Sequence, residues 1–336
     1  MGQGLSSHRL DEDQAERSCG GDQEYYRAER GGEVVSAGQS FLAIVNPAAG
    51  GGRSRKMLGP ALERLRAGGI QIELAETHAP GDASNLARAA YRRGQRDFIA
   101  VGGDGTSFEI VNGLYPEASA KEIPTLAFLP LGTGNSFLRD FSHRGVEHAI
   151  ESILARRRQT CDVLRLRHRE GIIHYINLLS MGFTADVATL RARRFHDWGQ
   201  LGYIISIFLG LARLERRPFP VRLNGETDFD RRRSLFLTFN NSKFTGGTMM
   251  IAPHAEVNSG LIEYVRWGPI GRLGLVRNLP RLYDGTHIRH PLAERKAVPL
   301  AEFDLAGPVD VMVDGEVLTL HCEKLSVLPR ALNVVA

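Results

Sequence analysis

The pattern of apolar and polar residues changes near residue 161, and this change divides the chain into two parts. From Phe41 to about Cys161, short apolar runs alternate with stretches that have the 3.6-residue period of amphipathic helices. Strands are expected at 41–46, 70–75, 97–101 and 125–129, and helices at 53–67, 83–93, 107–114 and from Ser136 onward. This alternation predicts a parallel sheet with right-handed crossovers.

Beyond Asp162 the apolar runs are short and follow one another closely, which is typical of antiparallel sheets. A helical stretch at 187–214 interrupts them. The runs lie at 163–167, 172–178, 221–223, 235–239, 261–267, 309–313 and 317–320. We therefore expect a β-sandwich in this half. Residues 1–38 are polar and have neither pattern, so they are expected to form a disordered tail.

The composition fits a globular enzyme of 336 residues, of which 43% are hydrophobic and 24% charged. A formal net charge of +4 does not indicate a nucleic-acid partner. Cys19, Cys161 and Cys322 are too few and too scattered for a disulfide framework or a zinc site. The apolar stretch 201–214 is shorter than the ~20 residues of a membrane-spanning helix. A cytoplasmic location is therefore expected.

Glycine-rich turns follow three of the predicted strands, at 46–52, 101–106 and 130–135. The carboxyl ends of parallel strands lie on one edge of a sheet, so these turns should converge. Glycine lets the backbone approach a phosphate closely, and amides at helix starts favour anions. The turns therefore predict a nucleotide site, in which Asp104 is free to meet a metal or a proton.

The common phosphate-binding motifs, Gly-x-x-x-x-Gly-Lys-Ser/Thr and Gly-x-Gly-x-x-Gly at the first helix, are absent. The chain instead resembles the diacylglycerol kinase catalytic-domain superfamily, which includes bacterial lipid kinases, sphingosine kinases and ceramide kinases. The resemblance covers about residues 41–330. It rests on five segments in order: Asn46-Pro47 with Gly50; Gly102 to Thr106 with Glu109 and Asn112-Gly113-Leu114; Leu129 to Phe137; Gly182-Phe183; and Asp314-Gly315-Glu316.

The resemblance implies a fold and a domain division. Residues 39–161 correspond to an α/β nucleotide-binding domain with a parallel sheet, similar to NAD kinases and diacylglycerol kinases. The last residues, about 325–336, are expected to complete that domain. Residues 162–324 correspond to an antiparallel β-sandwich that holds the lipid, and the active site is expected in the cleft between the two domains.

The resemblance also implies which residues contact ATP. They are Asn46, Thr77, Gly102, Gly103, Gly105, Thr106, Glu109, Gly132, Thr133 and Gly134. Asp104 is implied to support Mg²⁺, a hard cation that prefers oxygen ligands. For Thr77, a loop hydroxyl that faces solvent is an equal alternative.

Asp314-Gly315 lies between two β-runs and is a strong signal for a two-residue hairpin turn. From the residues alone, this segment is interpreted as a hairpin turn. With the resemblance, Glu316 is similar to the residue of bacterial lipid kinases that accepts the proton of the lipid hydroxyl. Asp104 is the alternative base, as in sphingosine-kinase-like mechanisms.

The segment 180–187 resembles sphingosine kinases, in which the residue matching Asp186 contacts the amino group of a long-chain base. A carboxylate beside an apolar pocket would select a cationic amine. The alternative is a carboxylate at a helix N-terminus that meets the helix dipole or Arg191.

Ser259 departs from the family pattern, because bacterial relatives carry an Asp there that binds a structural Mg²⁺. A neutral hydroxyl is a poorer ligand for this ion. That second metal is therefore not part of the expected site.

Together these features predict an ATP- and Mg²⁺-dependent kinase that phosphorylates a hydroxyl of a membrane-derived lipid such as diacylglycerol, with peripheral membrane contact. One alternative is a sphingoid-base kinase that uses Asp186. Another is a nucleotide- or lipid-binding protein with little kinase activity, which Ser259 motivates. The runs Arg156–Arg158 and Arg231–Arg233 are either contacts to anionic lipid or solvated surface.

Overall fold

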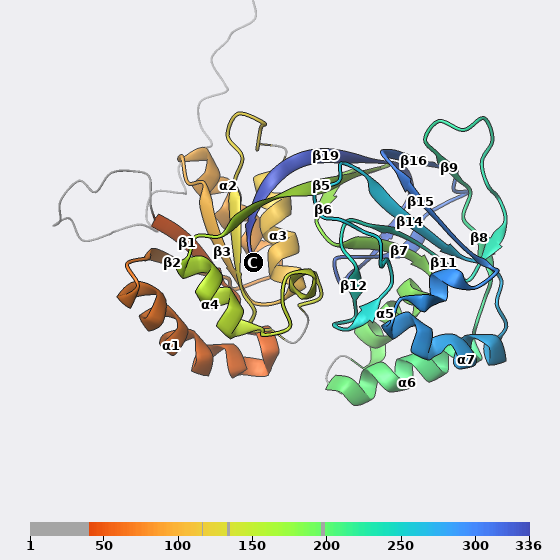
Figure 1. Ribbon diagram of the computed structural model, residues 1–336, viewed down its shortest axis with the longest axis horizontal. Coiled ribbons are helices and arrows are strands. Elements are labelled where there is room, and N and C mark those ends of the chain that lie inside the picture. The colour runs from red at the N-terminus through yellow and green to blue at the C-terminus, as the bar shows by residue number, and fades with distance from the viewer. Residues whose placement is uncertain (1–39, 116, 133–134, 196–198) are drawn as a thin grey trace, which may run out of the picture. The chain divides into compact units, whose positions relative to one another are not determined.

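The computed structural model describes residues 40–336, apart from 116, 133–134 and 196–198. Its first half contains the predicted parallel sheet, in the order β2-β1-β3-β4 (Figure 1). The strands are β1 (Ser40–Val45), β2 (Gln71–Glu76), β3 (Asp97–Val101) and β4 (Thr125–Leu129). Each neighbouring pair in this order is parallel. The predicted α/β architecture is therefore confirmed.

Four helices cover the two faces of this sheet. They are α1 (Arg53–Ala67), α2 (Asp82–Arg92), α3 (Asp104–Leu114) and α4 (Val146–Leu154). Buried side chains of α2 and α3 pack with Ile44 and Phe98 on one face. Those of α1 and α4 pack with Val45 and Ile99 on the other. Successive residues of a strand point to opposite faces of the sheet. Because helices cover both faces, nearly every position of these strands must be apolar.

The last strand, β19 (Cys322–Val335), lies beside β4 and runs parallel to it. It also pairs antiparallel with β5 (Arg158–His168) and with β16 (Leu300–Phe303). The sheet continues through β16 to β9 (Val221–Leu223), while β6 (Gly171–Tyr175) pairs with β5. One nine-stranded sheet thus extends through both halves of the described chain. The domain boundary at 161/162 stays a prediction.

A second sheet of six antiparallel strands has the order β15-β14-β11-β7-β17-β18. Its strands are β15 (Ala293–Val298), β14 (Ile262–Trp267), β11 (Phe236–Asn240), β7 (Leu178–Gly182), β17 (Val309–Val313) and β18 (Glu316–Leu320). One face packs against the first sheet through a core that includes Tyr175 and Phe239. The predicted antiparallel sandwich is therefore confirmed.

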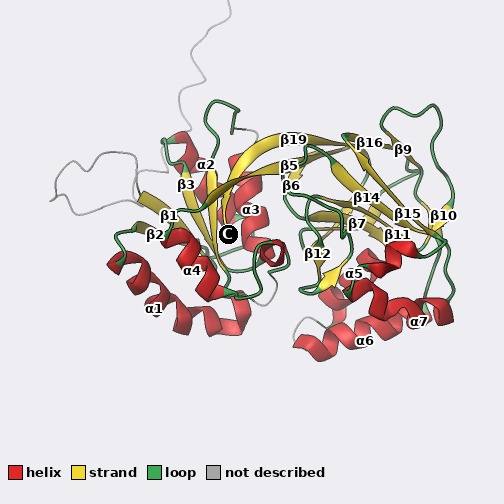
Figure 2. Ribbon diagram, in the orientation of Figure 1, coloured by secondary structure: helices red, strands yellow, loops and turns green. Residues whose placement is uncertain are grey.

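The other face of the six-stranded sheet is covered by α5 (Phe183–Arg194), α6 (Gly199–Ala212) and α7 (Arg272–Tyr283) (Figure 2). Phe236 and Trp267 of the sheet are buried under these helices. The remaining short elements are the 3-10 turns at Ala49–Gly52, Phe137–Asp140 and Thr286–Arg289, and the strands β8 (Arg217–Pro218), β10 (Arg233–Ser234), β12 (Phe244–Thr245) and β13 (Met249–Met250).

Some predicted elements differ from the observed ones. The helix expected from Ser136 onward is a 3-10 turn at Phe137–Asp140, and α4 begins only at Val146. The run 172–178 is divided between β6 and β7, because the amides of residues 176–178 bond to the side chain of Asp314. The helical stretch 187–214 forms two helices. The sequence patterns did not predict α7.

Candidate functional site

The three glycine-rich turns meet at the carboxyl edge of the parallel sheet, as predicted. The amide of Gly132 donates to the carbonyl of Gly102 at 3.0 Å. A Cβ on Gly132 would lie 2.7 Å from the nitrogen of Gly103, and one on Gly50 would lie 2.6 Å from the carbonyl oxygen of Leu131. These approaches leave no room for a side chain, so glycine is required for the turns to touch. Thr133 and Gly134 lie outside the described residues.

Helix α3 begins in the second turn, with Gly103 as its N-cap and Asp104 as its first residue. Asp104 Oδ2 accepts a hydrogen bond from the amide of Ser136, at 3.0 Å. Burial raises the pKa of Asp104, and the amide of Ser136 opposes that rise. Amides at the helix start form a ready site for an anion. A carboxylate and a helix N-terminus of the kind that favours anions therefore lie side by side.

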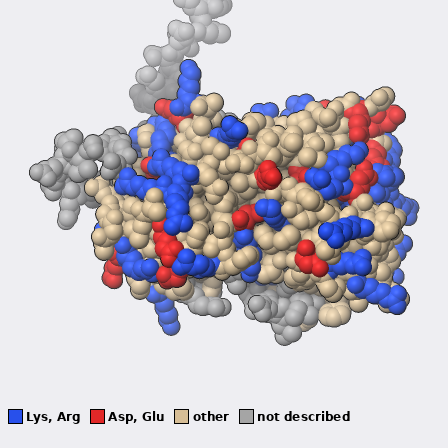
Figure 3. Space-filling view, in the orientation of Figure 1, with Lys and Arg blue, Asp and Glu red and all other residues tan. Residues whose placement is uncertain are grey.

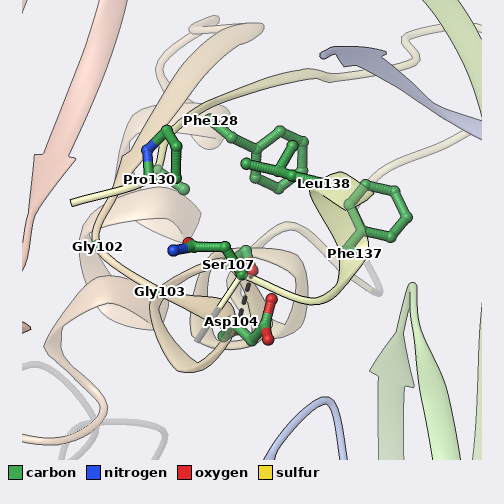
Figure 4. A pocket seen from close by; sticks show the side chains of 10 residues that line it. Gly102, Gly103, Asp104, Ser107, Phe128, Pro130, Phe137 and Leu138 are labelled. Carbon is green, nitrogen blue, oxygen red and sulfur yellow. Dashed lines mark hydrogen bonds between the residues drawn. The ribbon is translucent and has the colours of Figure 1, made fainter. Parts of the chain in front are cut away.

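A small pocket opens at this helix start (Figure 4). The sheet and the third turn supply its apolar wall, with Phe128 and Phe137, and α3 supplies Asp104 and Ser107. Its residues are Ala100, Gly102, Gly103, Asp104, Ser107, Phe128, Pro130, Asn135, Phe137 and Leu138. Thr106, in the same turn of α3, is buried, and its hydroxyl has no hydrogen-bond partner within the described part of the chain.

The hairpin between β17 and β18 brings a second carboxylate to the same place. Asp314 and Gly315 are its turn residues, with φ of 47° and 91°, as a two-residue type I′ turn requires. Glu316 follows the turn, and a Cβ on Gly105 would overlap its Oε1 atom. Gly315 also lies near the second turn, since a Cβ on it would be 3.9 Å from the Cβ of Asp104. The hairpin therefore reaches the start of α3, where the carboxylate of Glu316 lies against Gly105.

Glu316 as a whole residue is exposed, but its carboxylate lies against α3. Burial of the carboxyl group raises its pKa, and the nearby carboxylate of Glu109 raises it further. A carboxylate with a raised pKa is a better proton acceptor than an ordinary one. This makes Glu316 a candidate general base.

Asp314 does more than form the predicted turn. Its side chain is buried, at 2% exposure, and accepts hydrogen bonds from the amides of Ile176, Asn177 and Leu178 at 2.9, 3.0 and 2.9 Å. Burial raises the pKa of Asp314 to about 7, against the opposing effect of the amides. The carboxylate therefore ties the hairpin to β7. The motif Asp314-Gly315-Glu316 pointed to this residue, but only as a turn.

Two other predicted ATP contacts lie at the same edge, and their side chains bond to nearby backbone. Asn46 Oδ1 accepts from the amide of Ala48 at 3.0 Å. The hydroxyl of Thr77 donates to the carbonyl of Val45 at 3.3 Å. Thr77 is therefore not the solvent-facing loop hydroxyl that the sequence also allowed.

The side chain of Glu109, a further predicted ATP contact, caps helix α2. Its two carboxylate oxygens accept from the amides of Gly81 and Ala83 at 3.0 and 3.1 Å. These amides belong to the N-terminus of α2, where a negative charge is stabilising. A structural role in joining α3 to α2 is thus evident for Glu109, and its contact with ATP stays a prediction.

Asp186 lies in the first turn of α5, which packs on the strands β17 and β18 of the candidate site. Its carboxylate forms an ion pair with Arg217, which lies far from it in sequence. Burial raises the pKa of Asp186, and Arg217 lowers it. The sequence had named the helix dipole or Arg191 as the partner of Asp186. Its place in the first turn of α5 agrees with the dipole, and its ion pair is with Arg217 in place of Arg191.

Comparison with known proteins agrees with this geometry. Residues 40–166 match the family described as "Diacylglycerol kinase catalytic domain", and residues 177–336 match the "YegS C-terminal NAD kinase beta sandwich-like domain". The chain therefore contains a diacylglycerol kinase catalytic domain followed by a YegS-type C-terminal domain. These domains mark it as a kinase, and the two matched regions follow each other in the order that the sequence predicted.

Individual relatives extend over nearly the whole kinase. A diacylglycerol kinase of Mycobacterium tuberculosis is 26% identical over 311 residues, which cover 90% of this chain and 98% of that one. A protein of Xanthomonas oryzae named "Probable lipid kinase YegS-like" is 29% identical over 280 residues, 82% of this chain and 89% of that one. A crystal structure of a diacylglycerol kinase from Bacillus anthracis has a TM-score of 0.64 and 19% identity, over 88% and 96% of the two chains. That structure shows likeness of fold.

The kinase site fits a magnesium ion only in part. Among the described residues there is no group of three or more His, Cys, Asp or Glu side chains that could hold a metal ion. Mg²⁺ in kinases is usually held by one or two carboxylates together with substrate phosphates. Asp104 at an anion-binding helix start is such a carboxylate, so the residues fit an ion that arrives with a nucleotide.

The residues around Ser259 do not fit the second, structural Mg²⁺ of bacterial relatives. The hydroxyl of Ser259 bonds within its own loop, to Leu261. Asp162 holds this loop instead, because it accepts the amide of Gly260 at 2.6 Å and that of Arg330 at 2.7 Å. Hydrogen bonds within the protein therefore hold this loop.

Segment 243–247 of the second half contacts the turn that follows β4, and the sequence did not reveal this. Lys243 forms an ion pair with Asp140 at 3.2 Å, and the Asp140 side chain is only 4% exposed. The amide of Gly247 donates to the hydroxyl of Ser136 at 2.9 Å. Ser136 also bonds Asp104, so this segment supports the candidate site.

No helix among the described residues is long and apolar enough to cross a membrane.

Substitution of Gly132 by Ala is expected to weaken nucleotide binding and lower thermal stability. The new Cβ would lie 2.7 to 3.0 Å from backbone atoms of Gly102 and Gly103, so the backbone of the turns would have to shift. Overpacking of this kind typically costs about 1–3 kcal/mol. Calorimetric titration with ATP and thermal unfolding measure the two effects.

Gly59→Ala is the matched control, because a Cβ at Gly59, inside α1, would have no neighbour within 4 Å. This variant should bind ATP normally and be more stable by about 0.5–1 kcal/mol. If Gly132→Ala bound ATP as well as Gly59→Ala, close contact of the turns would not be needed for the nucleotide.

Proposed function

We propose that this kinase transfers the γ-phosphoryl group of ATP to a hydroxyl of a membrane-derived lipid, with diacylglycerol as the first candidate. One observation carries the proposal: the carboxylate of Glu316 lies against Gly105, the residue that follows Asp104 in the first turn of α3, where free amides suit an anion. A proton acceptor and a phosphate site therefore adjoin. The names of the relatives, diacylglycerol kinase and YegS-like lipid kinase, support the choice of a lipid acceptor.

The glycine-rich turns would hold the triphosphate. The amides of Gly103 and Gly105 and the hydroxyl of Thr106, which has no partner among the described residues, are suited to phosphate oxygens. The amide of Gly102 already donates to the carbonyl of Leu129 at 3.2 Å, so Gly102 would act through its lack of a side chain. Asp104 would hold Mg²⁺ together with the phosphates, and that ion, when bound, would neutralise phosphate charge. The other proposed nucleotide contacts are Asn46, Thr77, Glu109, Gly132, Thr133 and Gly134.

In the proposed transfer, the lipid hydroxyl loses its proton to Glu316 as its oxygen attacks the γ-phosphorus. The bond between the γ-phosphorus and the bridging oxygen breaks, and ADP leaves with that bond's electron pair. Catalysis of this reaction depends on positioning and on charge stabilisation. Asp314 is a positioning residue here, because it anchors the hairpin that carries Glu316.

The sphingoid-base alternative depends on Asp186. Its half-buried carboxylate is near the strands that carry Glu316, which suits recognition of an acceptor. However, Arg217 already pairs with it, and an amine would have to displace this guanidinium. A neutral acceptor such as diacylglycerol needs no such exchange, and we therefore propose it first.

The proposal is tested with labelled ATP, Mg²⁺ and separate micelles of diacylglycerol and sphingosine, followed by chromatography of the lipids. We expect label on diacylglycerol and little on sphingosine. Label mainly on sphingosine, lost in Asp186→Asn, would instead establish the sphingoid-base kinase. ATP binding without label on any lipid of a wider extract would contradict kinase function and favour a binding protein.

A further inference from the structure

We propose that the kinase docks on anionic lipid bilayers through the outer surface of α6 and α7. This surface, called the α6–α7 face, consists of Phe208, Leu209, Arg213, Leu273, Val276, Arg277, Arg281 and Tyr283. The inference rests on the proposed function only in one respect, namely that the acceptor lipid resides in a bilayer.

Large apolar side chains are exposed on both helices. Phe208 of α6 is 66% exposed, and Leu273, Val276 and Tyr283 of α7 are 64%, 45% and 49% exposed. The three residues of α7 are separated by three and seven positions, so they form one stripe along the helix. The opposite side of α7 packs into the core through Leu275 and other buried residues. The exposed apolar stripe of α7 is therefore not needed for packing of the helix against the core.

The two helices present their exposed residues on one surface. The guanidinium of Arg272, at the start of α7, donates to the carbonyls of Leu211 and Ala212, at the end of α6, at 3.0 and 2.9 Å. Both helices cover the same core above the six-stranded sheet, and they lie next to each other in Figure 1. The end of α6, which carries Phe208 and Leu209, and the start of α7, which carries Leu273, therefore lie side by side.

Positive charge surrounds this apolar surface. Arg213, Arg277 and Arg281 are exposed, and none of them takes part in an ion pair with another described residue. Figure 3 shows Lys and Arg side chains gathered over the region of α7. Exposed apolar residues bordered by Arg are typical of surfaces that bind anionic bilayers.

The arginine runs noted in the sequence are less suited to this role. Arg158 pairs with Asp97 at 2.8 Å, and Arg232 pairs with Asp230 and Glu294 at 2.6 and 2.7 Å. Their charge is partly compensated, and a lipid headgroup would have to replace the carboxylates. On the α6–α7 face the carboxylate of Asp284 lies near Arg281, but none of its three arginines forms an ion pair with another described residue, and so we assign the contact to this face.

The α6–α7 face is connected to the candidate base through one helix. A Cβ on Gly210 of α6 would lie 2.9 Å from Val187 of α5, so these helices are in close contact. Helix α5 in turn packs on β17 and β18, which flank the turn before Glu316. Docking at this face would place the bilayer on the side of the sandwich where α5 leads to the site.

The test is flotation of the full chain with vesicles of phosphatidylcholine, with and without phosphatidylglycerol. We expect binding only to the anionic vesicles, and its loss at 1 M salt, where the Debye length is about 3 Å. Arg277→Gln/Arg281→Gln should lower the partition coefficient about 25-fold, at about five-fold for each charge. Phe208→Ser/Leu273→Ser should also lower it, since both apolar contacts are lost.

Matched controls carry the same changes elsewhere. Arg156→Gln/Arg157→Gln removes two exposed charges, and Ile172→Ser removes an apolar side chain that is 51% exposed. Both controls should bind vesicles as the unchanged protein does. Equal loss in the controls, or binding that the α6–α7 variants retain, would overturn the proposal. A dimer that only the α6–α7 variants dissociate, with vesicle binding unaffected, would do so too.

Kinase activity on short-chain diacylglycerol in solution separates this inference from the proposed function. The α6–α7 variants should keep their activity on that acceptor and lose it on vesicles. Absence of transfer to any lipid, with vesicle binding intact, would count against the proposed function alone.

Discussion

Glu316→Gln is expected to reduce phosphoryl transfer to lipid about 10²- to 10⁴-fold, the usual contribution of a general base. Gln is similar in shape to Glu, but it cannot accept the proton of the lipid hydroxyl. The nucleotide would be held by the turns and the start of α3, so ATP affinity should not change. Single-turnover transfer from labelled ATP measures the chemical step, and calorimetry measures ATP binding.

Glu323→Gln is the control for this variant, because it neutralises an exposed carboxylate on β19 that pairs with Arg167 at 3.3 Å. Its activity should be normal, since exposed pairs of this kind contribute little. Near-normal activity of Glu316→Gln would reject Glu316 as the base. Asp104, the other carboxylate at the start of α3, would then be the next candidate.

The pH dependence of transfer activity is a second test of Glu316 as the general base. A general base acts in its ionised form, so activity falls as pH falls through the pKa of that group. Burial and Glu109 raise the pKa of Glu316, which places this loss at a higher pH than for an ordinary glutamate. Glu316→Asp keeps a titrating carboxylate and should retain an acid limb at reduced rate. In Glu316→Gln this limb should disappear or move to the pKa of another group.

Sequence patterns predicted the elements whose signal is local. The helix at 53–67 and the strands at 97–101 and 125–129 have the predicted bounds, because continuous apolar strands and an amphipathic helix leave no alternative. Helix α7 was missed, since Gly274 and Pro280 interrupt its pattern. Burial of Leu275 and Leu282 against the sheet stabilises it nevertheless.

The candidate site was predictable where its chemistry lies within short motifs. The three glycine turns could be placed on one edge because parallel strands end there, and their contacts confirm it. The contacts of Asp314 with residues 176–178 join positions more than a hundred residues apart. The ion pair of Lys243 with Asp140 does so too. No pattern in one sequence marks such pairs, because tertiary packing alone brings them together.

Asp314→Ala is expected to lower the free energy of unfolding by about 3 kcal/mol or more, at about 1–3 kcal/mol for each buried amide that loses its acceptor. The amides are those of Ile176, Asn177 and Leu178, which the carboxylate now accepts. Transfer activity should also fall, because the hairpin would no longer hold Glu316 against α3. Urea unfolding and the single-turnover assay measure the two effects.

The same carboxyl group gives stability a pH dependence. Burial raises the pKa of Asp314 to about 7 in the folded protein, whereas unfolded Asp has a pKa of about 3.9. The folded protein therefore holds this proton more tightly, and the contribution of the group to stability declines as pH rises from about 4 to about 7. Asp314→Asn has no titrating group, so this decline should be absent.

Asn224→Ala separates loss of the amide acceptor from the strain of the turn. Asn224 and Gly225 have φ of 54° and 75°, similar to Asp314 and Gly315, but Asn224 is exposed. Both Ala variants therefore share the cost of a left-handed conformation, about 1–2 kcal/mol. A larger loss at Asp314 measures what the three amides contribute. Equal losses would show that the hairpin is stabilised by its turn and strands, and that Glu316 does not depend on Asp314 for its position.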